Sequence, residues 1–280
     1  MTSYAQRQEP YIIEKHQIYP EQLATQRVEK IRHTHHFFTD GKRVDSKSYW
    51  ESMKINTETG KVEVRIYAPY EGKTQATYYF YENEGCTTPT SEDVYEVSED
   101  ENVEDIYLVT RVYTLDKKCS VTGYRDEDDN IHQIRKREVH FNEDGQLTDI
   151  FDWSNSNTQW GVRWNYKYQD NNSRIIEQYN NYVQRLLHQI EYLNDKGKVI
   201  KRCNINAEGK EVDCATFNFD YDKDYILKES VYVGENKLFR QTVYTRDANK
   251  RTQKITISTP NSEGKMVVTE EHTFEYFIVK

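Results

Sequence analysis

The feature that most constrains this chain is a turn-forming motif that returns at nearly constant spacing. Acidic residues open the motif at Glu143, Asp170, Asp195, Asp222 and Asp247, which gives steps of 27, 25, 27 and 25 residues. Two positions after each acid stands Gly, Asn, Gly, Asp or Asn, and these residues tolerate the positive φ that tight turns require. The pattern predicts a repeated structural unit with a turn at a fixed place.

A second turn in each unit divides it into two strands. Ala207–Lys210 and Gly234–Lys237 are the clearest examples, so that one strand with its turn takes roughly 13 residues, as is usual in all-β folds. The chain has 23 tyrosines, a residue that suits a half-buried, pleated surface. We therefore predict an all-β fold: an antiparallel meander of repeated β-hairpins in a single curved or rolled sheet, with two packed sheets as the alternative.

Four segments are expected along the chain. Residues 1–30 form an irregular N-terminal segment, in which Pro20 is placed to open a short helix. Residues 31–90 form N-terminal β-hairpins, and residues 106–280 form the β-hairpin repeat region. Residues 91–105 hold eight acids and are expected to be a solvated acidic loop between them.

Charge and motif content exclude several classes of function. Acids outnumber bases 47 to 38 and the net charge is −9, whereas binding to phosphates needs clustered lysines and arginines. Nucleic acid is therefore not an expected partner, and no apolar stretch approaches the ~18 residues of a membrane span. The sequence contains no nucleophile elbow, P-loop, zincin motif or Rossmann glycine pattern. We expect no catalytic residues, no cofactor and no enzymatic activity.

Residues 139–259 resemble the YD (RHS-type) repeats of bacterial surface proteins and polymorphic toxins. The residues that carry the resemblance are Phe219-Asp220-Tyr221-Asp222, Glu191-Tyr192-Leu193-Asn194-Asp195-Lys196-Gly197 and Val243-Tyr244-Thr245-Arg246-Asp247. The resemblance implies strips of β-hairpins, often in exported proteins. Short Tyr/Gly hairpin repeats of the MORN type are the competing label.

The four cysteines suggest two disulfides. Cys203 and Cys214 flank the Ala207–Lys210 turn at equal distances, which places them opposite each other on adjacent strands. Cys86 and Cys119 bracket the acidic segment and are the second expected pair. The alternative is four unrelated thiols in a cytosolic protein. The absence of any C-x-x-C pattern argues against a zinc ribbon.

Two clusters have the composition of a metal site without its spacing. His33, His35 and His36 place two imidazoles on one face of a strand, but no acidic or cysteine partner stands at a fixed spacing, and a solvated strand face is the preferred interpretation. The acids of residues 126–130 lack the EF-hand glycine, and a hairpin turn is expected there. No metal site is predicted.

The best candidate for a binding site is an aromatic hairpin. Trp153, Trp160, Trp164 and Tyr166 surround a stretch that contains Asn155 and Asn157. Exposed aromatic rings beside asparagines stack on sugars or anchor a protein partner. The alternative is cross-strand packing that stiffens one hairpin.

The sequence leaves three functions open. The first is a non-catalytic exported module that presents a hairpin surface to a protein or glycan, with a periplasmic, cell-surface or secreted location. The small-x-Ala pattern of Ser3–Ala5 fits a signal cleavage site, and an ordinary cytosolic start is the alternative. The second is a cytoplasmic immunity protein whose acidic balance suits a basic toxin. The third is a glycan-binding or glycan-processing protein.

Overall fold

The computed structural model describes residues 17–69, 72–81, 89–97, 106–113, 119–126, 128, 130–153, 160–169 and 172–279. Within these residues it contains one α-helix and 18 β-strands. The elements are α2 (Pro20–Thr25), β1 (Val28–Thr39), β2 (Lys42–Ile55), β3 (Val62–Pro69), β4 (Gln75–Phe80), β5 (Ser91–Glu96), β6 (Ile106–Tyr113), β7 (Cys119–Arg125), β8 (Ile131–Phe141), β9 (Leu147–Trp153), β10 (Trp160–Gln169), β11 (Ser173–Asn180), β12 (Arg185–Leu193), β13 (Val199–Ile205), β14 (Glu211–Asp222), β15 (Tyr225–Val233), β16 (Lys237–Arg246), β17 (Thr252–Pro260) and β18 (Met266–Ile278). The predicted all-β class and the short helix after Pro20 are confirmed.

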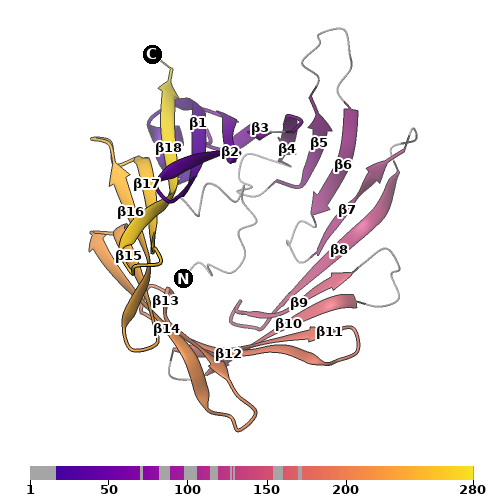
Figure 1. Ribbon diagram of the computed structural model, residues 1–280. Coiled ribbons are helices and arrows are strands. Elements are labelled where there is room, and N and C mark those ends of the chain that lie inside the picture. The colour runs from indigo at the N-terminus through magenta and orange to yellow at the C-terminus, as the bar shows by residue number, and fades with distance from the viewer. Residues whose placement is uncertain are drawn as a thin grey trace. The chain divides into compact units, whose positions relative to one another are not determined.

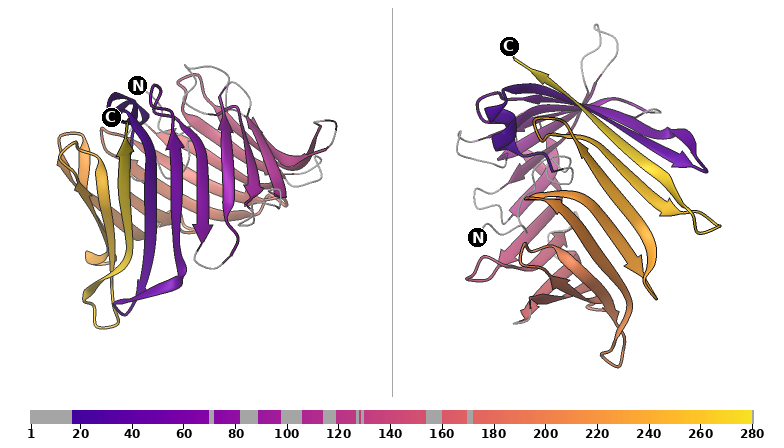
Figure 2. Two further views of the ribbon diagram at one scale, coloured as in Figure 1. Left: turned by 90° about the horizontal axis from the view of Figure 1, so that it is seen from above. Right: turned by 90° about the vertical axis from the view of Figure 1, so that its left-hand side faces the viewer.

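The strands form an antiparallel meander within one sheet, in which consecutive strands pair through hairpins. Figure 1 labels them in order around the chain. The pairing of β1 with β18 is the exception, because it joins the first strand to the last, as in His33 opposite Phe274 and His35 opposite His272. Figure 2 shows β18, in yellow, between β17 and the indigo β1. The prediction of a single sheet is confirmed. An open curved or rolled sheet is wrong, because the first and last strands pair with each other. Pairing the first strand with the last satisfies backbone groups that an open sheet leaves exposed.

The chain forms two compact units, which are described separately. Unit 1 contains residues 110–218 and 231–238, and unit 2 contains the remaining described residues up to 109, with 219–230 and 239 onward. Strands from the two ends of the chain therefore lie in the same unit. The four consecutive segments expected from the sequence do not predict this grouping.

Six hairpins share one five-residue turn, which accounts for three positions of the sequence repeat, Glu143, Asp195 and Asp247, while Asp222 ends β14 and is separated from β15 by two residues. In the turn that begins at Asn194, the Asn194 N–H donates to the carbonyl of Lys198, and the Gly197 N–H donates back to the Asn194 carbonyl. The Asn194 side-chain oxygen accepts from the backbone N–H groups of Lys196 and Lys198. An Asn or Asp at the first position and positive φ at the fourth are therefore built into the turn. The other five turns with this bonding begin at Asn142, Asn180, Asn206, Asp247 and Asn261.

In the acidic turn after β7, the side chain of the first residue also accepts hydrogen bonds from the backbone of the turn. Asp126 accepts backbone hydrogen bonds from Asp128 and Asn130, and His132 lies 2.7 Å from its second carboxylate oxygen. The hydrogen bond with His132 and those from the backbone lower the pKa of Asp126 to about 2. The expected hairpin turn at residues 126–130 is confirmed for the residues that the structure describes.

The predicted acidic loop at residues 91–105 is wrong in its first part. Ser91–Glu96 is strand β5 and pairs with β4, where Asp93 stands opposite Tyr78 and Glu92 opposite Tyr79. Both acids are buried. Strand pairing overrides the preference of a charge run for solvent, which no local composition rule detects. Residues 98–105 lie outside the described residues.

The apolar core of unit 2 lies under its N-terminal segment. Leu23 of α2 packs with Ile18, Val28 and Ile31 in one buried cluster that also contains Met53, Ile55, Val62, Ile255 and Phe274. Pro20 occupies the first turn of α2, where its missing N–H is not needed. No described helix has the length and hydrophobicity that crossing a membrane requires.

Candidate functional site

A buried polar cluster continues the core of unit 2 along the same sheet face. His33 of β1 is fully buried, and its Nδ1 lies 3.3 Å from an Oε2 of Glu51, which comes from β2 and is 1% exposed. Arg65 of β3 contacts the other oxygen of that carboxylate. Three neighbouring strands therefore place the guanidinium of Arg65, the carboxylate of Glu51 and the imidazole of His33 side by side on one face of the sheet.

The surroundings of Glu51 and His33 determine the charge that each side chain carries. Burial alone raises the pKa of Glu51, but the hydrogen bond with His33 and the charge of Arg65 outweigh burial, so the pKa falls below its usual value. Burial lowers the pKa of His33, against the opposing pull of Glu51. At neutral pH Glu51 is therefore ionised and His33 is neutral, and the neutral imidazole donates its Nδ1–H to the carboxylate.

A second group of imidazoles extends the cluster to the last strand. His33 Nε2 lies 3.0 Å from Nδ1 of His272, and His35 Nε2 lies 3.1 Å from Oε2 of Glu270. The rings of His35 and His272 stack with centroids 3.8 Å apart. His35 is 5% exposed and His272 is 2% exposed. The expectation of a solvated histidine face is therefore wrong for His33 and His35, because they lie on the same face of β1 as Ile31 of the buried core.

The sequence analysis missed Glu51, Glu270 and His272 as members of this cluster. Their positions are 18 to 239 residues away from His33 in the chain, and their proximity depends on the pairing of β1 with β2 and β18. Glu270 and His272 do alternate with Phe274 along the last strand, which is the one signal that indicates a shared face.

The remaining buried carboxylates with described partners face arginine or lysine. Glu191, 1% exposed, accepts from Nε of Arg174 at 2.8 Å and from Nε of Arg202 at 2.7 Å. Glu177 accepts from Lys167 and Arg185. A carboxylate held by two cations is stabilised in its ionised form and is a weak proton acceptor. The ion pairs of these two acids link neighbouring strands of the sheet.

The pairing of β9 with β10 divides the predicted aromatic patch. Trp164 stands opposite Ile150, which is three positions from Trp153. Because successive residues face opposite sides of a strand, Trp164 and Tyr166 lie on one face and Trp153 lies on the other. The aromatic residues therefore do not form one surface.

Two aromatic residues of this hairpin, Trp153 and Tyr166, lie near cations on neighbouring strands. Lys136 Nζ lies 6.0 Å from the centre of the Trp153 ring, and Arg174 lies 5.7 Å from that of Tyr166. Burial raises the pKa of Tyr166. This is the cross-strand packing that the sequence left as the alternative. Trp160 belongs to β10, and Asn155 and Asn157 lie outside the described residues, so a role of this hairpin in binding stays a prediction.

The turn between β11 and β12 exposes apolar side chains that the sequence analysis did not single out. Tyr182 is 76% exposed, Val183 is 68% exposed and Leu186, at the start of β12, is 57% exposed. Val183 also has a φ of +61°, a conformation that a β-branched residue rarely adopts. An exposed apolar tip with a strained backbone is an unusual combination within a chain of polar turns.

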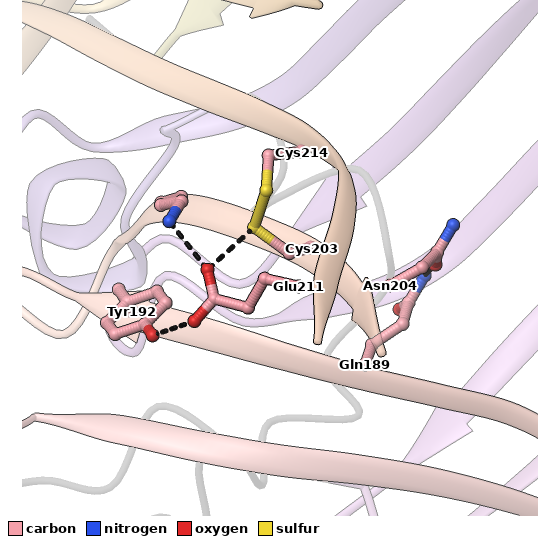
Figure 3. Close-up of a disulfide and its surroundings, with 7 residues drawn as sticks. Gln189, Tyr192, Cys203, Asn204, Glu211 and Cys214 are labelled. Carbon is pink, nitrogen blue, oxygen red and sulfur yellow. Dashed lines mark hydrogen bonds and ion pairs between the residues drawn. A yellow bond between two sulfur atoms is a disulfide. The ribbon is translucent and has the colours of Figure 1, made fainter. Parts of the chain in front are cut away.

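The predicted Cys203–Cys214 disulfide is present, with a Cα–Cα distance of 4.1 Å. Figure 3 shows it on β13 and β14 with Glu211 beside it: Glu211 Oε2 lies 3.3 Å from Cys203 Sγ, while the other oxygen accepts a hydrogen bond from Tyr192. The pairs Arg202–Ala215 and Lys201–Thr216 have the predicted register, whereas Asn204–Val212 next to the turn is shifted by one residue, so a strand irregularity brings Cys203 opposite Cys214. Cys86 and the side chain of Cys119 lie outside the described residues, so their pairing stays a prediction.

Replacing Cys203 and Cys214 by alanine is expected to lower the free energy of unfolding by about 2–3 kcal/mol, because the bond closes a short loop in the unfolded chain. Urea denaturation of the double variant and of the oxidised parent measures the difference. Equal stability, or a non-reducing peptide map without a Cys203–Cys214 linkage, would contradict this account.

Comparison with known proteins assigns no family. No family model and no curated protein matches the sequence. A porin-like protein from Bacteroides uniformis aligns over 89% of this chain and 98% of its own, at 9% identity and a TM-score of 0.41. A chain of a TcdB2–TccC3 structure aligns over 84% of this chain but 15% of its own, at 9% identity and a TM-score of 0.35. A LolA-superfamily protein from Nitrosomonas europaea aligns over 93% and 91%, at 10% identity and a TM-score of 0.29. Similarity this distant assigns neither a family nor a function, and the YD and MORN labels stay predictions.

Proposed function

We propose that this chain is a non-catalytic, exported binding module that uses the tip of the β11–β12 hairpin to contact a protein partner. The observation that carries the proposal is the exposure of Tyr182, Val183 and Leu186 at this tip. A few residues, often tyrosine, supply most of the binding energy in protein interfaces, and neighbouring contacts exclude water around them. This tip, called the apolar tip below, has that composition.

The backbone of the apolar tip gives independent support. The six related turns differ at the fourth position, where four have glycine with φ between +72° and +77° and one has Lys250. Val183 occupies this position in the sixth. A left-handed conformation costs an L-residue roughly 1–2 kcal/mol, and strain of this kind gathers at functional sites. Turn chemistry favours glycine, so the valine points to a role outside the fold.

Other features agree with export and with the lack of catalysis. A disulfide forms and persists in oxidising compartments, and Cys203–Cys214 is such a bond. The buried acids Glu51, Glu177 and Glu191 are engaged by cations, which leaves them poorly suited to proton transfer. The immunity-protein alternative rests on the acidic balance of the chain and requires a cytoplasmic location, where such a disulfide is rare.

Site-specific photocross-linking tests the proposal. A photoreactive phenylalanine analogue replaces Tyr182 in one variant and Glu208 in a control variant, because Glu208 occupies the same position in another of the six turns. Both variants are irradiated in an extract of the native host. We expect a discrete protease-sensitive adduct from position 182 and none from position 208.

The other outcomes of this experiment are decisive. A protease-resistant, glycosidase-sensitive adduct at position 182 would replace the protein partner by a glycan. The same adducts from both positions, or none from either, would remove the apolar tip as a docking element.

Exchanging the fourth residues of two related turns measures the strain. Val183→Gly is expected to raise the free energy of unfolding by about 1 kcal/mol, because glycine adopts positive φ without the steric penalty. Gly209→Val places valine in an equivalent turn with open space around its Cβ and is expected to lower stability by about 1–2 kcal/mol. Urea denaturation of both variants gives the two values. A loss of stability in Val183→Gly would show that the valine serves the fold.

A further inference from the structure

The buried cluster on β1 and β18 contains a set of three ligand atoms that the binding role does not use. One ligand atom each from His35, Glu270 and His272 lies within 4.8 Å of the other two. The Glu270 oxygen is 3.1 Å from His35 Nε2 and 3.9 Å from His272 Nε2. Tetrahedral zinc with bonds near 2.0–2.1 Å places its ligand atoms roughly 3.3 Å apart. The Glu270–His35 distance already fits this spacing, whereas the Glu270–His272 distance must shorten by about 0.6 Å, and a separation at the 4.8 Å limit would have to shorten by about 1.5 Å.

The hydrogen bonds around the cluster orient the His272 imidazole for a metal, whereas Nδ1 of His35 is buried without a hydrogen-bond partner among the described residues. A carboxylate oxygen can only accept from a neutral ring's N–H, so the contact of His33 Nδ1 with Glu51 fits the tautomer in which His33 Nε2 accepts from the Nδ1–H of His272. The Nε2 of His272 then carries a lone pair and faces the Glu270 carboxylate. Metal-binding histidines are held in this way, with the second ring nitrogen bonded to a supporting group.

We propose that His35, Glu270 and His272 bind one zinc ion that fastens β1 to β18. Two imidazoles and one carboxylate form a recognised zinc ligand set. The two histidines are buried, whereas the Glu270 side chain is 33% exposed, so the ion has a route of entry and a side for a fourth ligand. The site stabilises the pairing that joins the first and last strands, which is separate from the role of the apolar tip.

Metal titration of the full-length, tag-free chain tests the site. After removal of metal with a chelator, the protein is titrated with Zn²⁺ by calorimetry and with Co²⁺ by visible absorption. We expect one equivalent of each ion to bind, tetrahedral cobalt bands to appear, and Zn²⁺ to raise the Tm. Glu270→Gln keeps the volume of the side chain and removes one of three ligands, so it is expected to weaken Zn²⁺ binding by more than the roughly 10- to 100-fold loss of an outer-shell partner.

The chain offers a matched control pair on the opposite face of the same two strands. His36 stands opposite Glu271, one position along from the ligands, and His36→Gln with Glu271→Gln is expected to leave zinc affinity unchanged. X-ray absorption spectroscopy of the zinc-loaded wild-type chain provides a measurement that does not depend on any variant. We expect the spectrum to show two histidine ligands.

Three results would overturn the site. These are no zinc binding by the wild-type chain, equal weakening by the control pair and by Glu270→Gln, or an absorption spectrum without histidine ligands. In each case a shared proton between His35 and Glu270 would account for their contact.

Discussion

Gly60→Ala is expected to lower the free energy of unfolding by about 3 kcal/mol or more, a sum of backbone strain and steric overlap. Gly60 closes the turn between β2 and β3 with a φ of +70°, and an added Cβ would lie 1.8 Å from the carbonyl oxygen of Pro20. The methyl group must displace the start of α2, which carries Leu23 into the core. Urea denaturation measures the loss.

Gly264→Ala separates the two contributions. Gly264 has a φ of +77° in the same unit, but an added Cβ meets no atom within 4 Å. We expect this control to lose only about 1 kcal/mol, the backbone contribution. Equal losses in Gly60→Ala and Gly264→Ala would mean that α2 does not rest on the turn.

Glu51→Ala is expected to lower the free energy of unfolding by about 3–5 kcal/mol, because it leaves Arg65 and His33 without their buried counter-ion. Glu63→Ala is the control: Glu63 pairs with Lys54 at 2.9 Å, but the lysine side chain is 69% exposed. Such a surface pair contributes about 0–1 kcal/mol. Urea denaturation of both variants provides the comparison.

A double variant decides whether the loss comes from the unpaired arginine. Replacing Glu51 by Gln and Arg65 by Met removes both charges, and we expect it to recover part of the stability lost in Glu51→Ala. A Glu51→Ala loss as small as that of Glu63→Ala would mean that the cluster does not depend on its carboxylate.

Local chemistry made much of the fold predictable. Each five-residue turn is determined by an Asn or Asp and a residue with positive φ, so the turns at Asn194, Asn206 and Asp247 are visible in the sequence. The Cys203–Cys214 bond is predicted from its turn, although a one-residue register shift between the turn and the bond also contributes to their pairing. These features depend on neighbours along the chain, which a sequence pattern describes directly.

The histidine cluster could not be predicted because its partners meet through distant strands. His35 and Glu270 are 235 residues apart, and their contact requires the register of β1 on β18. The division of the aromatic patch depends likewise on how β9 and β10 pair, which includes a register shift between Trp160 and Val162. A one-residue change of register moves a side chain to the other face, and the sequence does not specify where such shifts occur.

We propose that the residues of the apolar tip lower the free energy of unfolding and, in exchange, provide affinity for a protein partner. The measurement is the dissociation constant and the free energy of unfolding of one variant, Tyr182→Asn with Val183→Gly, against the wild-type chain, using the partner identified by cross-linking at position 182. We predict that the variant unfolds with a higher free energy and binds its partner at least about 30-fold more weakly, the effect of removing an aromatic anchor. Unchanged affinity would contradict the claim.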